Sequence, residues 1–431
     1  MRPFPIRNDA PILAPAIDSQ ENQFSSAFAF IRKAIADRVF PAASIAVTQS
    51  GKLLALKSFG TFVYEEDVQG APSLSHSSDS ACPDRSRRHE DFDFPNEQVI
   101  PATLFDLASL TKSIATTTMA MMLYERGLLE LDAPVIGTVP EFLLDSSGNS
   151  DPRRHDVTFR MLLAHSAGLP AYEKLFLKAQ SREDLLTAAM TMPLKAGPGT
   201  RAEYSDIGFI ILGVALERLA QESLAVFCQR EVFGPLAMMN TTFNPSPELR
   251  QKIPPTADER KAVCGAGAPA REMSKAELVQ SVSHSETRGT FRHRIIQGEV
   301  QDENAWVLGG TAGHAGLFST AEDVARFANA LLRGGSPILR PETIALFTQP
   351  DTTPHTSRAL GWDTPSNPSQ SGKYFGPRSY GHLGYTGTSL WIDPDRELSV
   401  TLLTNRTWPD CANQAIRRFR PEFHDLVIEC L

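Results

Sequence analysis

The residues of this sequence whose types and spacing could do chemistry begin with Ser109 and Lys112. They stand near the start of an apolar run, 107–126, that has no Gly or Pro and is ended by Gly127 in the manner of a helix C-cap. Residues three apart share one face of a helix, so the lysine amine can reach the serine hydroxyl. A desolvated lysine can take the proton of the hydroxyl, and the positive end of the helix dipole favours the resulting alkoxide. Alone, Ser-x-x-Lys equally describes a capping serine and a surface lysine.

Four blocks of the sequence, in order, resemble the motifs of one protein family. They lie in 105–135, 162–170, 204–209 and 381–394, and include FDLASLTK, LLAHSAGLP, YSDIGF and GHLGYTGTSLWIDP. The sequence resembles the serine β-lactamase-like family, which contains class C β-lactamases, low-molecular-weight penicillin-binding proteins and related esterases and amidases. Ordered matches are far more specific than any single motif. The resemblance implies a cofactor-free serine hydrolase that cleaves ester or amide bonds through an acyl-enzyme, with Ser109 as nucleophile.

The second motif of this family, Tyr-x-Asn, corresponds to 204–206. The resemblance places the phenol of Tyr204 in the cleft, projecting from a loop that precedes a helix starting near Ile207. A phenol beside the cation of Lys112 is expected to have a lowered pKa and to shuttle protons, with core packing as the alternative. Asp206 stands where many relatives have Asn. It is either the N-cap of the following helix or a charge that raises the pKa of Lys112.

The third motif departs from the family pattern, because His382 replaces the lysine of Lys-Thr-Gly. A permanent cation is thereby replaced by a neutral or switchable imidazole, as in many esterases and amidases of the family. The resemblance implies that His382 and Gly384 lie on an edge strand lining the cleft, where Gly384 lets backbone approach closely. The backbone N–H groups of Tyr385 and Ser109 would form the oxyanion hole. A histidine satisfied within the core is the alternative for His382.

A narrower resemblance comes from 302–305 and 308–320, which contain Asp-Glu-Asn-Ala and a glycine-rich run around His314. These segments are similar to the subgroup of exo-acting N-acetylmuramoyl-L-alanine amidases of cell-wall recycling and a related penicillin-binding protein. Members usually have His before Asp-Glu-Asn, where this chain has Gln301. His314 either reaches the substrate or shapes a turn. His165 is interpreted as structural, bonding backbone in the helical part of the chain.

The expected substrate is therefore a muropeptide amide or a small ester. A true β-lactamase or DD-peptidase is an alternative, although His382 and Asp206 disfavour substrates that carry a carboxylate. The other alternative is a non-catalytic relative that binds peptidoglycan, which intact Ser109, Lys112 and Tyr204 argue against.

Composition narrows the possible functions further. The 431 residues are 42% hydrophobic and include 24 Phe, as is typical of a globular protein. The net charge of −8 argues against nucleic acid as the main partner. Five cysteines without a CxxC pair indicate neither a disulfide framework nor a zinc site, and no dinucleotide or Walker motif occurs, so neither a metal nor a cofactor is expected. No apolar run approaches the roughly 20 residues of a membrane span, and the N-terminal apolar run is short and contains Pro11 and Pro15, so a cytoplasmic location is expected.

Hydrophobic patterning predicts an α+β architecture, and the family resemblance implies that it is of the β-lactamase/transpeptidase-like type. Expected helices are 24–39, 107–126 and 319–332, and expected strands are 43–49, 53–59, 379–393 and 398–404. We interpret 1–22 as a loose leader and 23–431 as a single catalytic domain, with 65–98 as an exposed, acidic and serine-rich insertion. Within the domain, about 23–108 and 305–431 form an antiparallel sheet flanked by helices. About 109–304 form an inserted helical lobe, and the active site lies between the two parts.

Overall fold

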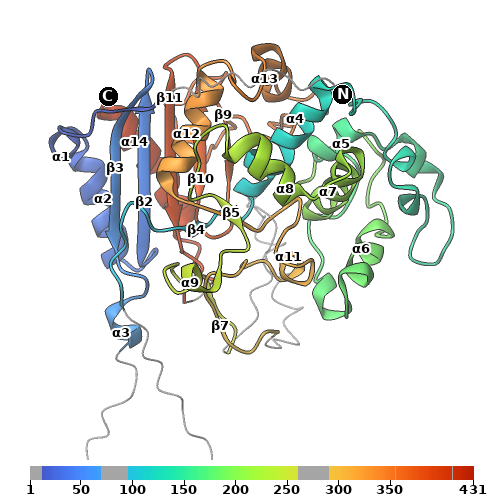
Figure 1. The fold of residues 1–431 in the computed structure, drawn as a ribbon, viewed down its shortest axis with the longest axis horizontal. Helices are drawn as coiled ribbons and strands as arrows, with labels where there is room; N and C mark the ends of the chain where they lie inside the picture. The colour runs from blue at the N-terminus through green and yellow to red at the C-terminus, as the bar shows by residue number, and fades with distance from the viewer. Residues whose placement is uncertain (1–11, 69–95, 261–290, 355, 410) are drawn as a thin grey trace, which may run out of the picture.

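The computed structural model describes residues 12–68, 96–260, 291–354, 356–409 and 411–431. Its main sheet has six strands in the order β1-β3-β2-β11-β10-β9. All neighbouring pairs are antiparallel except β1 with β3. The strands are β1 Ala14–Pro15, β2 Ala42–Gln49, β3 Lys52–Gly60, β9 Tyr380–Leu383, β10 Ser389–Asp393 and β11 Leu398–Thr404. The strands from the two ends of the chain lie side by side in Figure 1, as predicted.

Both faces of this sheet are covered. Along β2, Ile45 and Val47 join the apolar cluster of α2 (Ser25–Ala36) and α14 (Ile416–Glu429), whereas Ala42 and Ala46 join the cluster that includes α12 (Ala321–Leu332). The N-cap Thr320 of α12 accepts a hydrogen bond from the Asp323 N–H, which fixes the start of this helix. Because each face of β2 has its own cover, the strand is almost continuously apolar rather than alternating.

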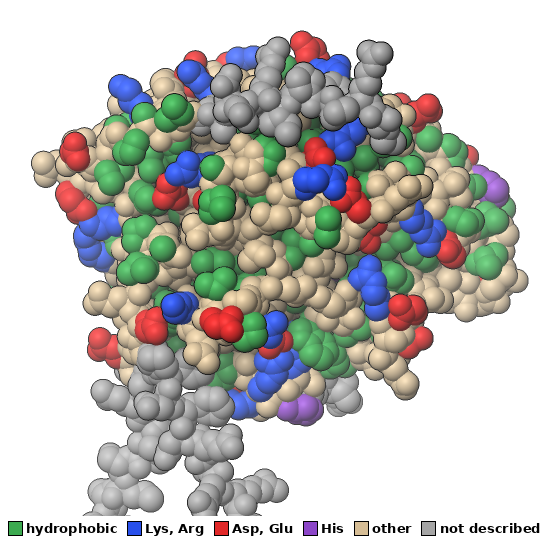
Figure 2. Space-filling view, viewed as in Figure 1, with side chains coloured by type: hydrophobic (Ala, Val, Ile, Leu, Met, Phe, Trp, Pro, Cys, Tyr) green, Lys and Arg blue, Asp and Glu red, His purple; other side chains and the backbone are tan. Residues whose placement is uncertain are grey.

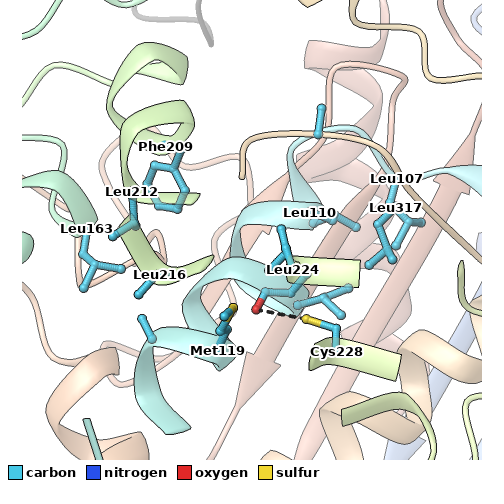
Figure 3. Close-up of a cluster of buried hydrophobic side chains, with 14 of the residues drawn as sticks. Leu107, Leu110, Met119, Leu163, Phe209, Leu212, Leu216, Leu224, Cys228 and Leu317 are labelled. Atoms are coloured by element: carbon cyan, nitrogen blue, oxygen red, sulfur yellow. Dashed lines mark hydrogen bonds between the residues drawn. The ribbon is translucent and has the colours of Figure 1, made fainter. Parts of the chain in front are cut away.

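Helices gather beyond the β9 edge of the sheet, on the right of Figure 1. Apolar side chains of η1, α4, α5, α7 and α8 meet there in one buried cluster, which Figure 3 shows. The elements are η1 Lys112–Thr117, α4 Thr118–Glu125, α5 Phe159–Leu163, α6 Arg182–Met190, α7 Asp206–Ala220, α8 Leu224–Cys228 and η6 Gln229–Phe233. η1 is a π-helical turn, a feature that often marks functional sites. η1 continues into α4, and Gly127 follows the C-cap of α4 with a φ of 68°, as predicted.

Smaller elements connect these two parts. Three short strands form a second sheet, β4-β8-β5, and β6 pairs with β7. The remaining elements are β4 Phe105–Asp106, β5 Thr242–Phe243, β6 Ala257–Asp258, β7 Ile295–Ile296, β8 Leu317–Ser319, α1 Gln20–Gln23, α3 Glu65–Val68, η2 Val135–Gly137, η3 Pro140–Leu143, η4 Pro152–Asp156, η5 Leu175–Leu177, α9 Pro247–Arg250, α11 Glu303–Val307 and α13 Pro341–Thr348.

Several local predictions need correction. Of the predicted loose leader 1–22, residues 1–11 lie outside the described residues, and residues 12–22 are not loose, because β1 pairs with the free edge of β3 and Leu13 is buried. Of the predicted 65–98 insertion, 69–95 lie outside the described residues, and α3 begins the segment. The expected helix 107–126 starts later, because Ala108 has a φ of 47°. The expected strand 379–393 is divided into β9 and β10 by a turn at 384–388. Cys411 is disulfide-bonded, which the unpatterned cysteine spacing did not predict, whereas the thiols of Cys228 and Cys430 are free.

On the face shown in Figure 2, basic and acidic side chains of the described residues are interspersed without an extended patch of one sign. In the described part of the chain, every helix is too short or too polar to span a bilayer.

Candidate active site

The backbone just before Ser109 is held in an unusual conformation. Ala108 has a positive φ of 47°, which is strained for a residue with a Cβ. The carboxylate of Asp106 stabilises this turn, since Oδ1 accepts from the Ala108 N–H at 2.8 Å and Oδ2 accepts from the Gln301 N–H at 2.7 Å. Ser109 therefore sits at the junction between β4 and the helix that begins at Leu110.

Two side chains, one three residues away and one from a distant segment, meet at the Ser109 hydroxyl. Lys112 Nζ lies 2.8 Å from Ser109 Oγ, and Tyr204 Oη donates to the same oxygen at 2.7 Å. The alcohol, amine and phenol are thus within mutual reach, as the sequence motifs predict. The remaining predicted residues lie around this group.

Lys112 is completely buried and has two further acceptors. Its Nζ donates to Asp206 Oδ1 at 2.6 Å and to the backbone oxygen of His314 at 3.0 Å. Burial lowers the pKa of Lys112, and the Asp206 carboxylate opposes this shift. The predicted influence of Asp206 on the pKa is confirmed in direction. Its alternative role as N-cap is wrong, because the Ser205 side chain caps α7 by accepting from the Gly208 N–H at 3.0 Å.

The phenol of Tyr204 behaves differently from the expectation. Its pKa is raised well above the ordinary value, because burial and the Asp206 carboxylate both disfavour a phenolate. The expected lowering is wrong, and the phenol stays a proton donor. His165 supports this loop as predicted, since its Nδ1 accepts from the Ser205 N–H at 3.0 Å and its ring lies 4.6 Å from the Tyr204 ring centre.

His382 lies on β9, the edge strand, and is buried. Its Nδ1 donates to the Leu383 carbonyl at 2.7 Å, since a carbonyl can only accept, and this leaves Nε2 as an acceptor without a partner among the described residues. Burial and the nearby Lys112 and Arg358 cations hold the pKa of His382 well below its ordinary value. The imidazole is therefore neutral at the position where relatives carry a lysine cation, with its ring centre 6.0 Å from that of Tyr204.

The turn at 384–388 is joined to the segment that leads to Ser109. Thr386 Oγ1 donates to the Asp106 carbonyl at 2.7 Å, and Thr388 Oγ1 donates to the Leu107 carbonyl at 3.0 Å. A side chain on Gly384 would overlap the Thr388 hydroxyl and the Leu107 oxygen, so the close approach expected at Gly384 is present. These contacts bring the backbone beside Tyr385 next to the backbone that carries Ser109.

His314 does not project freely from its glycine-rich loop. It is buried, its Nε2 lies 2.8 Å from Asp302 Oδ1, and its backbone oxygen accepts from Lys112. Close packing of Gly313 against Gly213 of α7 leaves no room for a side chain on either glycine. Of the two predictions for His314, the structural one fits its side chain, while its carbonyl contributes to the site. Among the described residues, no group of three His, Cys, Asp or Glu side chains is arranged to bind a metal.

Arg358 is a residue of the site that sequence reasoning missed. Its guanidinium carbon lies 5.3 Å from the centre of the Tyr204 ring, its side chain is 20% exposed, and the nearest carboxylate oxygen, on Asp363, is 3.6 Å away. The charge of Arg358 contributes to lowering the pKa of Lys112, His165 and His382. A permanent cation therefore stands at the site although the third motif has none. No motif marks it, because it enters from a loop.

Comparison with known proteins agrees with this geometry. A profile described as Beta-lactamase matches residues 28–420. The chain is 30% identical over 387 residues to an N-acetylmuramyl-L-alanine amidase of Bacillus subtilis (strain 168), covering 85% of this chain and 77% of that protein. It is also 30% identical over 337 residues to a putative D-alanyl-D-alanine carboxypeptidase of Salmonella agona (strain SL483), covering 73% and 72%.

Among solved structures, the fold is similar to that of EstCE1, described as a hydrolase with promiscuous acyltransferase activity. The TM-score is 0.65 at 21% identity, covering 95% of this chain and 99% of that one. With a profile match over most of its length, the chain belongs to the Beta-lactamase family and is a serine hydrolase of the β-lactamase/transpeptidase-like fold.

Proposed function

We propose that Ser109 is the nucleophile of this hydrolase and that Lys112 and Tyr204 handle its proton. The observation that carries this assignment is the convergence of Lys112 Nζ and Tyr204 Oη on Ser109 Oγ, at 2.8 and 2.7 Å. Both distances suit proton transfer without any movement of the backbone.

In the acylation step, neutral Lys112 takes the Ser109 proton as Oγ forms a bond to the substrate carbonyl carbon. The two protons that neutral Lys112 keeps remain directed at Asp206 and the His314 carbonyl, so the lone pair faces Ser109. The amide N–H groups of Ser109 and Tyr385 receive the oxyanion. The carbonyl then re-forms, the bond to the leaving nitrogen or oxygen breaks, and Tyr204 gives that atom its proton. Tyr204 recovers a proton from Lys112.

Deacylation repeats these transfers with water. Lys112 takes a proton from the water whose oxygen attacks the acyl carbon, and Ser109 leaves as the alcohol with the returned proton. The products are a carboxylic acid and a regenerated site. The raised pKa of Tyr204 supports its part in this scheme, because a neutral phenol can donate to a leaving group.

The preferred substrate is an amide between an N-acetylmuramoyl group and the L-alanine of a peptide. The amidase relative from Bacillus subtilis, of which the match covers 77%, supports this choice. Muropeptides carry carboxylates, and the guanidinium of Arg358 beside Tyr204 is suited to bind one of them. His382, which is neutral, offers Nε2 as an acceptor for an N–H of the peptide.

A D-alanyl-D-alanine carboxypeptidase is the second candidate. Arg358 favours it as well, because its cation can receive the terminal carboxylate of such a peptide. The putative carboxypeptidase from Salmonella agona supports this reading.

A substrate panel tests these assignments. Turnover is measured on N-acetylmuramoyl-L-alanyl-D-isoglutamine, a D-alanyl-D-alanine peptide, a cephalosporin and a short-chain p-nitrophenyl ester, for wild type and Ser109→Ala. We expect the muramoyl amide to have the highest kcat/KM, and Ser109→Ala to lose all turnovers. A fluorophosphonate should label Ser109 in the wild type, as peptide mass spectrometry would show. Full activity in Ser109→Ala would refute the catalytic assignment, and a higher kcat/KM for the D-alanyl peptide would replace the preferred substrate.

A further inference from the structure

The carbonyl oxygens of the turn at 384–388 are bound by a buried cation, Arg420. Arg420 of α14 donates from Nη2 to the Gly384 carbonyl at 2.7 Å and to the Thr388 carbonyl at 3.1 Å, and from Nε to the Gly387 carbonyl at 3.4 Å. The side chain is only 6% exposed, and no carboxylate pairs with it among the described residues. Burial of an unpaired cation costs free energy, which its hydrogen bonds to backbone oxygens must offset.

The carbonyl that Arg420 binds most closely shares a peptide unit with the Tyr385 N–H. In a trans peptide, the C=O of residue 384 and the N–H of residue 385 point in opposite directions. The hydrogen bond from Arg420 to the Gly384 oxygen therefore directs the Tyr385 N–H away from α14. That N–H has no partner among the described residues. Contacts of Thr386 and Thr388 to the backbone before Ser109 hold the same turn against the nucleophile.

The charge of Arg420 also acts on the strength of this donor. A cation hydrogen-bonded to a carbonyl polarises the whole peptide unit and makes its N–H a stronger donor. The effect is greatest when full negative charge develops on the atom that the N–H contacts. Because an oxyanion exists in the transition state and not in the bound substrate, such polarisation lowers the barrier without tightening substrate binding.

We propose that Arg420 is a positioning residue for acyl transfer, which orients and polarises the Gly384–Tyr385 peptide so that its N–H stabilises the oxyanion. This inference rests on the proposed function, because it takes the Tyr385 amide as an oxyanion donor. It adds a residue outside the sequence motifs, from the last helix of the chain.

The test compares two buried arginines. Arg154 is fully buried and likewise donates to backbone oxygens, those of Phe142, Met190, Thr191 and Met192, in the helical part of the chain. Arg420→Met and Arg154→Met remove comparable charges and hydrogen bonds. The readouts are kcat and KM for a p-nitrophenyl ester and the inhibition constant of phenylboronic acid, which adds to a serine as a tetrahedral anion that mimics the oxyanion.

In Arg420→Met, we expect kcat and the affinity for phenylboronic acid to fall about tenfold, with KM changed less than about twofold. In Arg154→Met, both quantities should stay within about twofold of wild type for the folded fraction. Wild-type boronate affinity in Arg420→Met, or an equal loss in Arg154→Met, would overturn the proposal. If Arg420→Met does not fold, Arg420→Lys decides, since its amine ends one bond short of Nη2, and wild-type boronate affinity there would overturn the proposal too.

Ser109→Ala separates this inference from the proposed function. If Ser109→Ala is inactive and Arg420→Met keeps wild-type boronate affinity, only the role of Arg420 fails. If Ser109→Ala retains full turnover, the proposed function itself fails.

Discussion

Lys112 Nζ and Asp206 Oδ1 form a buried ion pair at 2.6 Å. Two opposing influences act on the pKa of the Lys112 amine. Burial favours neutral Lys112, and the carboxylate favours the charged form. Where many relatives carry Asn, this chain therefore has a base that is harder to deprotonate.

Asp206→Asn should shift the pH dependence of the reaction. An amide oxygen can still accept from Lys112 but no longer stabilises its charge, so the pKa of Lys112 falls. Because neutral Lys112 is the active base, the acid limb of kcat/KM should move to lower pH. The measurement is kcat/KM for a p-nitrophenyl ester between pH 4 and 9. Asp132→Asn, at the exposed ion pair with Arg160, serves as control. An acid limb that moves to higher pH would contradict this assignment.

Arg358→Gln should weaken binding of anionic substrates selectively. Loss of a charge-assisted hydrogen bond should lower kcat/KM for N-acetylmuramoyl-L-alanyl-D-isoglutamine about tenfold or more, mainly through KM. Each kcat/KM for the muramoyl substrate is divided by kcat/KM of the same variant for a neutral ester. This ratio corrects for any change in the pKa of Lys112. Arg340→Gln, whose side chain is 57% exposed, is the control. An unchanged ratio would mean that Arg358 does not contact the substrate carboxylate.

Gly384→Ala should impair the oxyanion site. Its Cβ would overlap Thr388 Oγ1 and the Leu107 carbonyl, so the turn must move away from Ser109. We expect kcat/KM to fall about a hundredfold, as when one oxyanion donor is lost. Gly137→Ala, where a Cβ meets no atom within 4 Å, should stay within about twofold of wild type. Near-normal kcat/KM in Gly384→Ala would show that the turn is not needed in this position.

Glu303→Gln should stabilise the protein at high pH. Glu303 is fully buried, and neither carboxylate oxygen has a hydrogen-bond partner among the described residues. Burial and the adjacent Asp302 raise its pKa well above the ordinary value, so the folded state retains a proton that the unfolded chain releases. The stability linked to this proton is present below the unfolded pKa and is lost as pH rises through the folded pKa.

The measurement is the free energy of unfolding in urea at pH 4, 6 and 8. Glu303→Gln should gain about 1 kcal/mol or more at pH 8, and the gain should shrink toward pH 4. The exposed Glu130→Gln should change stability by less than about 0.5 kcal/mol at each pH. A gain that does not depend on pH would contradict the titration of Glu303.

The sequence predicts the parts of the site that depend on short spacing. Ser109 and Lys112 lie on successive turns, and the strands from both ends of the chain follow from their patterning. The pKa of Tyr204 was predicted with the wrong sign, because burial outweighs the nearby cation, and burial is a property of the folded chain. The sequence allows Asp206 to be an N-cap, but the preceding residue, Ser205, occupies that position.

Contacts between distant segments could not be predicted. Arg358 reaches Tyr204 from a loop, and Arg420 reaches the turn at 384–388 from the last helix, 32 residues after Thr388. Neither residue lies in a motif. Their roles depend on donors and acceptors that only the folded structure brings together, and composition or periodicity carries no signal for such a pairing.

The pairing of β2 with β11 has a consequence for the timing of folding. Ala43 pairs with Thr404 and Gln49 with Leu398, so the middle of the main sheet joins segments about 350 residues apart. During synthesis, β2 leaves the ribosome long before β11 exists, and the face of β2 that packs in the cluster of α12 stays exposed or shielded by a chaperone until that helix is made. The part of the sheet that carries His382 is therefore joined to β2 only after β11 has been synthesised.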